Sequence, residues 1–188
     1  MAKILAYDLA ILINQIDWTY EDLLRYRVDT TWQYRLSQIK GKYIVIRCDC
    51  PFKYVPQVLK WLRINNVEYD SLSLDPDMPD VQEKPVVAID IDGTLTKEIC
   101  WNEDQCKKAN PSKLVKKVIS AYKDVLVVLW TARREEFIPT TLQWMVKNNV
   151  PFHAVSTEKM AATLYIDDKT INPVPKKAKK LAKKLLSI

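Results

Sequence analysis

Short apolar runs alternate along the chain with stretches in which apolar residues recur at helical spacing. The runs at 44–47, 86–89 and 126–130 are too short for helices and are rich in valine, isoleucine and leucine, so they predict buried strands. The stretches at 55–62 and 138–146 place apolar residues three and four positions apart, which predicts amphipathic helices. Strands that alternate with helices predict an α/β fold, with right-handed crossovers, a parallel sheet and helices on its faces.

This pattern occurs twice in the chain. Within residues 42–73 and 124–156, positions align without gaps at the offset that separates Val45 from Val128, which is 83 residues. The shared positions are Pro56 with Pro139, Trp61 with Trp144, Asn65-Asn66-Val67 with Asn148-Asn149-Val150, and Ser73 with Ser156. Any two strand-helix-strand units share apolar positions, but they do not share tryptophan, proline and paired asparagines at one register. We interpret the pattern as an internal duplication, with an unrelated α/β unit in the first half as the alternative.

The segment 72–85 interrupts the pattern, because it is acidic, contains three prolines and lacks helical periodicity. We therefore predict a linker near the middle of the chain. The predicted parts are a smaller α/β half at 1–75, the linker at 76–85, a second α/β half at 86–175 and a basic amphipathic helix at 176–188.

The positive charge of the chain is concentrated at its C-terminal end. Six lysines within residues 176–184 equal the net charge of +6, so the remainder is close to neutral. Leu181, Leu185 and Ile188 share one helical face, which we expect to pack on the body of the protein. Two other uses stay open for this segment: a basic arm for nucleic acid, or a helix on a membrane surface. No run of about 18 apolar residues occurs, so no membrane-spanning helix is predicted.

The four cysteines come without signs of secretion. The opening stretch MAKILAYDLAIL has an aspartate inside its apolar run and no small-residue cleavage site, which is typical of a strand rather than a signal peptide. The spacing from Cys48 to Cys50 is too short for the usual zinc motifs, and no histidine lies near it. We therefore expect reduced thiols and a cytoplasmic location.

Polar side chains follow each predicted strand of the second half. Because the carboxyl ends of parallel strands meet at one edge of a sheet, we expect these side chains to lie close together. The clusters are Asp90 and Asp92 after 86–89, Thr131, Arg133 and Arg134 after 126–130, and Asp167 and Asp168 after the run at 163–166, with Lys159 eight residues before Asp167.

This set of residue types suits phosphoryl transfer. A carboxylate such as Asp90 can accept a phosphoryl group, and a second one, Asp92, can donate a proton to the leaving group and later accept one from water. Mg²⁺ prefers oxygen ligands and keeps several waters, so one or two aspartates, a backbone carbonyl and the substrate phosphate are sufficient ligands. A hydroxyl and a lysine can hold the remaining phosphate oxygens, while Gly93 permits a tight turn with its backbone N–H groups close to the phosphate.

The ordered motifs Asp-x-Asp-Gly-Thr-Leu, strand-Thr, Lys and Ile-Asp-Asp resemble those of the haloacid dehalogenase superfamily of phosphatases. The resemblance covers residues 86–171, about half the chain, and implies a Rossmann-like three-layer sandwich with a parallel sheet. The implied roles are Asp90 as nucleophile and metal ligand, Asp92 as acid/base and, through its carbonyl, metal ligand, Thr131 and Lys159 as phosphate ligands, Gly93 and Thr94 as substrate-binding residues, Asp167 as the main acidic Mg²⁺ ligand and Asp168 as its helper.

The stretches CWNEDQCKKANPS, WTARR and YIDDKTI further resemble a small capless branch associated with capsule or sugar-phosphate metabolism. Too few residues separate Thr96 from Val118 for a large cap domain, so we expect an open site that accepts bulky substrates or takes cover from a neighbouring subunit of an oligomer. Arg133 and Arg134 are candidates for binding a second phosphate or another anionic group, and a solvated helix start is the alternative.

The first half lacks the carboxylate set. Asp8 aligns with Asp90, but an alanine stands in the place of Asp92 and a cysteine in the place of Thr131, and nothing in residues 60–85 supplies Ile-Asp-Asp. We interpret this half as a degenerate copy that cannot hold the metal or transfer protons. Its Asp8 is expected to face solvent or a local amide.

Three functions are consistent with the sequence. The first is a Mg²⁺-dependent phosphomonoester hydrolase acting on a phosphorylated small molecule, such as a sugar or nucleotide phosphate. The second is a polynucleotide 3′-phosphatase guided by the C-terminal lysines, and the third is a non-catalytic binding or scaffold protein. The complete set of motif residues in the second half argues against the third function, because sequence drift in a non-catalytic protein would be expected to alter Asp92 or Asp167 first. His153, the single histidine, is expected to be structural, because the acid/base role is already filled.

Overall fold

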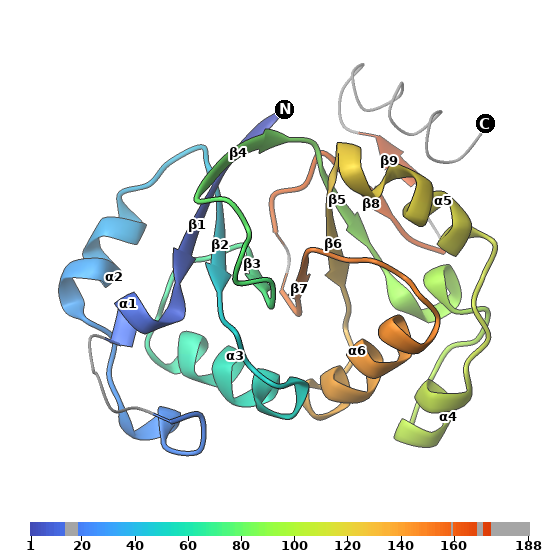
Figure 1. Ribbon diagram of the computed structural model, residues 1–188, viewed down its shortest axis with the longest axis horizontal. Coiled ribbons are helices and arrows are strands. Elements are labelled where there is room, and N and C mark those ends of the chain that lie inside the picture. The colour runs from blue at the N-terminus through green and yellow to red at the C-terminus, as the bar shows by residue number, and fades with distance from the viewer. Residues whose placement is uncertain (14–18, 159, 169–170, 174–188) are drawn as a thin grey trace.

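The computed structural model describes residues 1–13, 19–158, 160–168 and 171–173. Within these residues the strands form one sheet in the order β4-β1-β2-β3-β7-β6-β5-β8-β9 (Figure 1). The strands are β1 (Ala2–Asp8), β2 (Tyr43–Arg47), β3 (Ser71–Ser73), β4 (Val81–Lys84), β5 (Val86–Ile89), β6 (Leu126–Trp130), β7 (Ala154–Ser156), β8 (Leu164–Ile166) and β9 (Ile171–Pro173). The helices are α1 (Leu9–Ile13), α2 (Thr30–Ser37), α3 (Val55–Ile64), α4 (Glu103–Lys108), α5 (Leu114–Ala121) and α6 (Ile138–Lys147).

The α/β class expected from the sequence is confirmed, whereas a wholly parallel sheet is not. Strands β1 to β3 are parallel to one another, and so are β5 to β8. Three pairings are antiparallel: β1 with β4, β3 with β7, and β8 with β9. The chain returns from β3 to β4 through residues 74–80 without a crossover helix, and such a short return favours an antiparallel strand.

Alternating side chains of the strands form two separate apolar clusters. In β5, Val87 and Ile89 belong to the first cluster and Val86 and Ala88 to the second. All six described helices contribute buried side chains to the first cluster, and α3 and α6 lie side by side along that face (Figure 1). No described helical residue belongs to the second cluster, which includes loop residues Met78 and Met160. A three-layer sandwich needs helices on both faces, so that expectation is not confirmed among the described residues.

The elements of the two halves recur at the offset found in the sequence. Strand β2, helix α3 and strand β3 begin and end 83 residues before β6, α6 and β7. Trp61 and Trp144 are buried at equivalent positions of α3 and α6. Their indole N–H groups donate to the carbonyls of Tyr26 (2.9 Å) and Ala109 (2.8 Å), which are again 83 residues apart. Such agreement in contacts, as well as in sequence, supports the internal duplication.

The paired asparagines close both helices in the same way. Asn66 and Asn149 have φ values of 48° and 52°, in the left-handed region where asparagine is tolerated better than most side chains. The residues before them, Asn65 and Asn148, each donate from Nδ2 to the carbonyl of the helix tryptophan at 2.9 Å. The repeated asparagines are therefore explained by one C-terminal helix cap used twice.

The two halves share a sheet through the pairing of β3 with β7. At this junction Leu72 lies opposite Val155, its own equivalent in the other half, and the Ser73 hydroxyl donates to the carbonyl of His153 (2.7 Å). Part of the segment predicted to be a linker, Val81–Lys84, is strand β4, paired with β1. Because β3 and β7 are antiparallel, strands of the first half point their carboxyl ends toward the edge opposite to those of the second half.

Two expectations concern residues that the structure leaves undescribed. The predicted C-terminal helix at 176–188 and Lys159 both lie outside the described residues. The four cysteines are described, and all are buried and free. Among the described helices, none has the length and apolar character required to cross a bilayer.

His153 is held as a neutral structural group, as expected. Its Nδ1 accepts a hydrogen bond from the Val127 N–H (3.0 Å), and its ring stacks on Tyr122 with centroids 3.9 Å apart. At the equivalent position of the first half, the Asp70 carboxylate accepts from the Ile44 N–H (2.8 Å). Burial, aided by the charge of Lys84 and opposed by that of Asp75, lowers the pKa of His153 to about 4.

This lowered pKa predicts a loss of stability in mild acid. In the unfolded chain the histidine takes up a proton near pH 6.5, whereas in the folded protein it does so only near pH 4. The free energy of unfolding therefore keeps its full value above pH 6.5 and decreases as the pH falls toward 4. The ring is only partly buried, so we expect a loss of about 1–2 kcal/mol over this window. His153→Asn keeps an acceptor for Val127 without a titrating group. Urea unfolding at pH 7 and pH 4.5 should therefore show a smaller pH effect in the variant than in the wild type, and equal pH effects would contradict the prediction.

Candidate active site at the carboxyl edge of β5, β6 and β8

Strand β5 lies between β6 and β8, and all three are parallel, so the residues that follow them meet at one edge. A cavity of about 540 Å³ opens there. Six of the ten residues predicted from the sequence line it, together with six others. The lining residues are Asp90, Asp92, Arg133, Arg134, Asp167 and Asp168, with Ile99, Cys100, Trp101, Trp130, Ala132 and Phe137.

Asp90 is fixed by the strand and by the turn that follows it. Its backbone N–H donates to the carbonyl of Ile166 in β8 (2.9 Å), and its Oδ2 accepts from the Thr94 hydroxyl (3.2 Å). The turn passes through Gly93, whose φ is 76°. A Cβ on Gly93 would lie 3.3 Å from the Cβ and Oδ2 atoms of Asp168. Glycine is therefore favoured here both by its backbone conformation and by the close approach of the β8 loop.

Burial dominates the electrostatics of Asp90. The pKa of Asp90 is raised to about 6, chiefly by burial and to a smaller extent by the charges of Asp167 and Asp92. Hydrogen bonds from the Ile91 N–H and the Thr94 hydroxyl act in the opposite direction. Several carboxylates at one partly buried position favour a cation among them.

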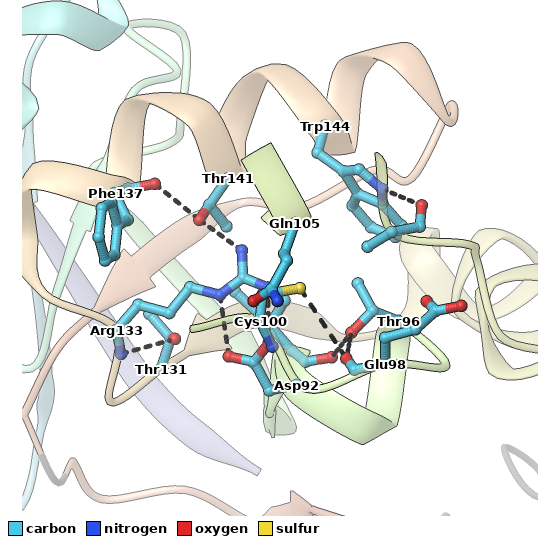
Figure 2. Close-up of polar contacts among 12 residues, drawn as sticks. Asp92, Thr96, Glu98, Cys100, Gln105, Thr131, Arg133, Phe137, Thr141 and Trp144 are labelled. Carbon is cyan, nitrogen blue, oxygen red and sulfur yellow. Dashed lines mark hydrogen bonds and ion pairs between the residues drawn. The ribbon is translucent and has the colours of Figure 1, made fainter. Parts of the chain in front are cut away.

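Asp92 is bound by a buried arginine. The Arg133 Nε and Nη2 atoms donate to its two oxygens at 2.9 and 2.7 Å, and the Cys100 N–H donates to Oδ1 at 2.9 Å (Figure 2). Arg133 Nη1 donates to the Thr141 hydroxyl of α6 (2.8 Å). Although burial acts against ionisation, these contacts lower the pKa of Asp92. The Arg133 side chain is only 3% exposed, so it is not the solvated helix start that the sequence allowed.

The remaining predicted residues differ in their access to the cavity. The Arg134 side chain is 79% exposed at the cavity, where it pairs with Glu136 (3.5 Å). Thr131 is buried, does not line the cavity, and accepts from the Arg133 N–H through its hydroxyl (3.1 Å). Gly93 and Thr94 are likewise not among the residues that line the cavity. A direct phosphate contact from Thr131 therefore requires a local change in this arrangement.

The donor set fits a magnesium ion that keeps most of its waters. In the part of the chain that the structure describes, no group of three or more histidine, cysteine or acidic side chains is arranged to hold a metal ion. The expected ligands are fewer, because they comprise the carboxylates of Asp90 and Asp167 and the backbone carbonyl of Asp92, with Asp168 as a helper. One or two carboxylates and a carbonyl suffice for Mg²⁺, so this set remains compatible with the ion.

The cavity also has an apolar wall that the ten predicted site residues do not include. Trp130 ends β6 and Phe137 is the N-cap residue of α6, while Ile99 and Trp101 flank the cavity on the segment before α4. The sequence offered one signal for this wall, since Cys100-Trp101 closely follows the first motif. It offered none for the bond between Asp92 and Arg133, which lie 41 residues apart.

The equivalent place in the first half is a smaller cavity of about 250 Å³, in which an arginine binds the aspartate. Arg47 donates from Nε and Nη2 to the two oxygens of Asp8 (2.9 and 3.0 Å), and it also contacts Asp80 (2.7 Å) and the carbonyl of Met78. Asp8 therefore faces neither solvent alone nor a local amide, because a guanidinium satisfies its charge. This arrangement provides a cation without a metal ion.

The first half also holds the loop that leads into β8. The Tyr43 hydroxyl of β2 donates to the sulfur of Met160 (2.9 Å), and Asp70 accepts from the Ala161 N–H (3.3 Å). Arg63, on α3, pairs with Glu135 and lies 3.9 Å from Glu158. In sequence, the predicted phosphate ligand Lys159 lies between Glu158 and Met160 and is outside the described residues.

No protein-family model matches the chain, and no curated protein matches it.

Proposed function

We propose that the protein is a Mg²⁺-dependent phosphomonoester hydrolase with a haloacid dehalogenase-like catalytic half. The main support is the convergence of Asp90, Asp92, Asp167 and Asp168 on one open cavity at the carboxyl edge of three parallel strands. This is the edge where α/β sheets bind their ligands. The phosphatase resemblance of the four ordered motifs supplies the reaction.

In the proposed reaction, a carboxylate oxygen of Asp90 attacks phosphorus. The new bond forms as the bond from phosphorus to the leaving oxygen breaks, which gives an aspartyl-phosphate and an alcohol. Water then attacks phosphorus, which releases inorganic phosphate and restores the carboxylate. A bound Mg²⁺ would neutralise charge on the phosphoryl oxygens. Asp92 is the proposed proton donor and later acceptor. In the arrangement described above it is bound by Arg133, so proton transfer requires that this pair first separate.

The observations favour a small substrate over a polynucleotide. A neighbouring cavity of about 790 Å³ shares Ile99 with the candidate active site and carries acidic side chains. These are Glu98, Glu103 and Asp104, which outnumber the one lysine in the same lining, Lys108. Such charges would repel a phosphate backbone that continued past the scissile group. The lysines that would guide nucleic acid lie outside the described residues.

The proposal predicts hydrolysis of a simple aryl phosphate that depends on Mg²⁺. Release of the aryl alcohol should fall at least about 10²-fold when EDTA removes the metal, and it should return when excess Mg²⁺ is added, because charge on the phosphoryl group would otherwise be unneutralised. The measurement is initial rate against Mg²⁺ concentration at fixed ionic strength, with Ca²⁺ as a comparison. No turnover with Mg²⁺, Mn²⁺ or Co²⁺ would favour the non-catalytic binding protein.

A further inference from the structure

Trp101 is the most exposed tryptophan described, at 79%, and it lies at the mouth of the candidate active site. Large aromatic side chains are normally kept from water, and those left exposed at a cavity commonly serve as contacts for ligands. Ile99, half exposed, lies two residues earlier and lines the same cavity. Together they form an apolar ledge beside the carboxylates.

Backbone hydrogen bonds hold the ledge in place. Between its two residues, the Cys100 N–H donates to Asp92 (2.9 Å), and after it, Asn102 caps α4 by accepting from the Gln105 N–H (3.0 Å). The Trp101 N–H itself donates to the Gln105 side chain (2.7 Å). The backbone of Trp101 is thus anchored to the active-site aspartate and to a helix start, so its side chain extends from a fixed point beside the candidate active site.

We propose that Trp101 stacks on a flat aromatic ring of the leaving group, and that the preferred substrates are nucleoside monophosphates. This inference rests on the proposed phosphomonoesterase function and narrows its substrate class. Trp130 and Phe137 add aromatic surface to the same cavity, which suits a base better than the hydroxyl-rich face of a sugar. The acidic neighbouring cavity limits the substrate to one phosphate group rather than a chain.

The test uses two substrates that differ by the base alone, adenosine 5′-monophosphate and ribose 5-phosphate. We expect the wild type to prefer the nucleotide by about tenfold or more in kcat/KM, the order of one base–aromatic stack. Trp101→Ala should remove this preference by acting on the nucleotide alone, and Trp101→Phe should restore part of it. Tyr34→Ala, which removes an exposed aromatic ring from α2 in the first half, is the control and should change neither rate.

The outcomes separate this inference from the proposed function. Equal loss of both activities in Trp101→Ala would overturn base stacking while leaving the phosphatase intact. Absence of hydrolysis of either compound would overturn the phosphatase. In that case, calorimetric titration of adenosine into the wild type and into Trp101→Ala still tests base stacking. Stacking predicts that the variant binds adenosine about tenfold more weakly than the wild type does. Equal affinity of the two proteins for adenosine would overturn the proposed stacking of Trp101 on the base.

Discussion

Replacing Asp90 by asparagine is expected to lower the turnover of an aryl phosphate at least about 10³-fold. The amide keeps the size and most of the contacts of the carboxylate, including the hydrogen bond from Thr94, but it is a poor nucleophile and a weaker ligand for a cation. The fold should be retained, because the position lies at the cavity rather than in the apolar core. The measurements are steady-state kcat with saturating Mg²⁺ and the urea midpoint of the same preparation.

The first half of the chain offers a matched control for Asp90→Asn. Asp8→Asn makes the same change at the equivalent position, where the carboxylate binds Arg47 instead of lining the candidate site. We expect it to keep wild-type turnover and to lose some stability. If both variants were equally active, Asp90 would not be the nucleophile. If both were equally inactive, the loss would come from the fold rather than from the chemistry.

Truncating Trp61 to alanine is expected to lower the free energy of unfolding by about 3–5 kcal/mol. The side chain is 0% exposed in the larger apolar cluster, and its indole N–H donates to the Tyr26 carbonyl (2.9 Å). The variant would therefore leave a cavity and a carbonyl without its donor. Urea unfolding followed by circular dichroism measures the change.

Trp101→Ala is the matched control for stability, since it removes the same side chain from an exposed position. We expect it to change the free energy of unfolding by no more than about 0.5 kcal/mol. A loss below 1 kcal/mol in Trp61→Ala would contradict the packing of α3 described here. A large loss in Trp101→Ala would mean that its ring packs against the protein, which would also weaken the case for a ligand contact.

Much of the candidate site follows from local pattern. The apolar runs before Asp90, Thr131 and Asp167 identify strands, and the parallel β5, β6 and β8 then bring their ends to one edge whatever the details of packing. The repeat was readable for a similar reason, because the asparagine caps and the buried tryptophans need particular side chains at particular positions.

The interactions that local pattern cannot specify are those between distant segments. Arg133 has the same sequence signature whether it is solvated or bound to Asp92, since the choice depends on how the loop after β6 faces the turn after β5. The direction of β4 depends on the absence of a crossover helix between two strands, and periodicity in residues 72–85 is too weak to reveal that strand. All described helices cover one face of the sheet, and this arrangement likewise depends on the handedness of the connections between strands and on the path of the chain.

The pairing of Leu72 with its own equivalent, Val155, has a consequence for how the chain arose and assembles. In an isologous interface, the type formed by twofold homodimers, a residue meets its own counterpart where it lies on the twofold axis. The chain thus has the arrangement of a dimer whose subunits have been covalently joined. Joining makes association independent of protein concentration and frees each copy from the symmetry that identical subunits must obey. One half could then pair Asp8 with Arg47 while the other kept the carboxylates that line the candidate active site.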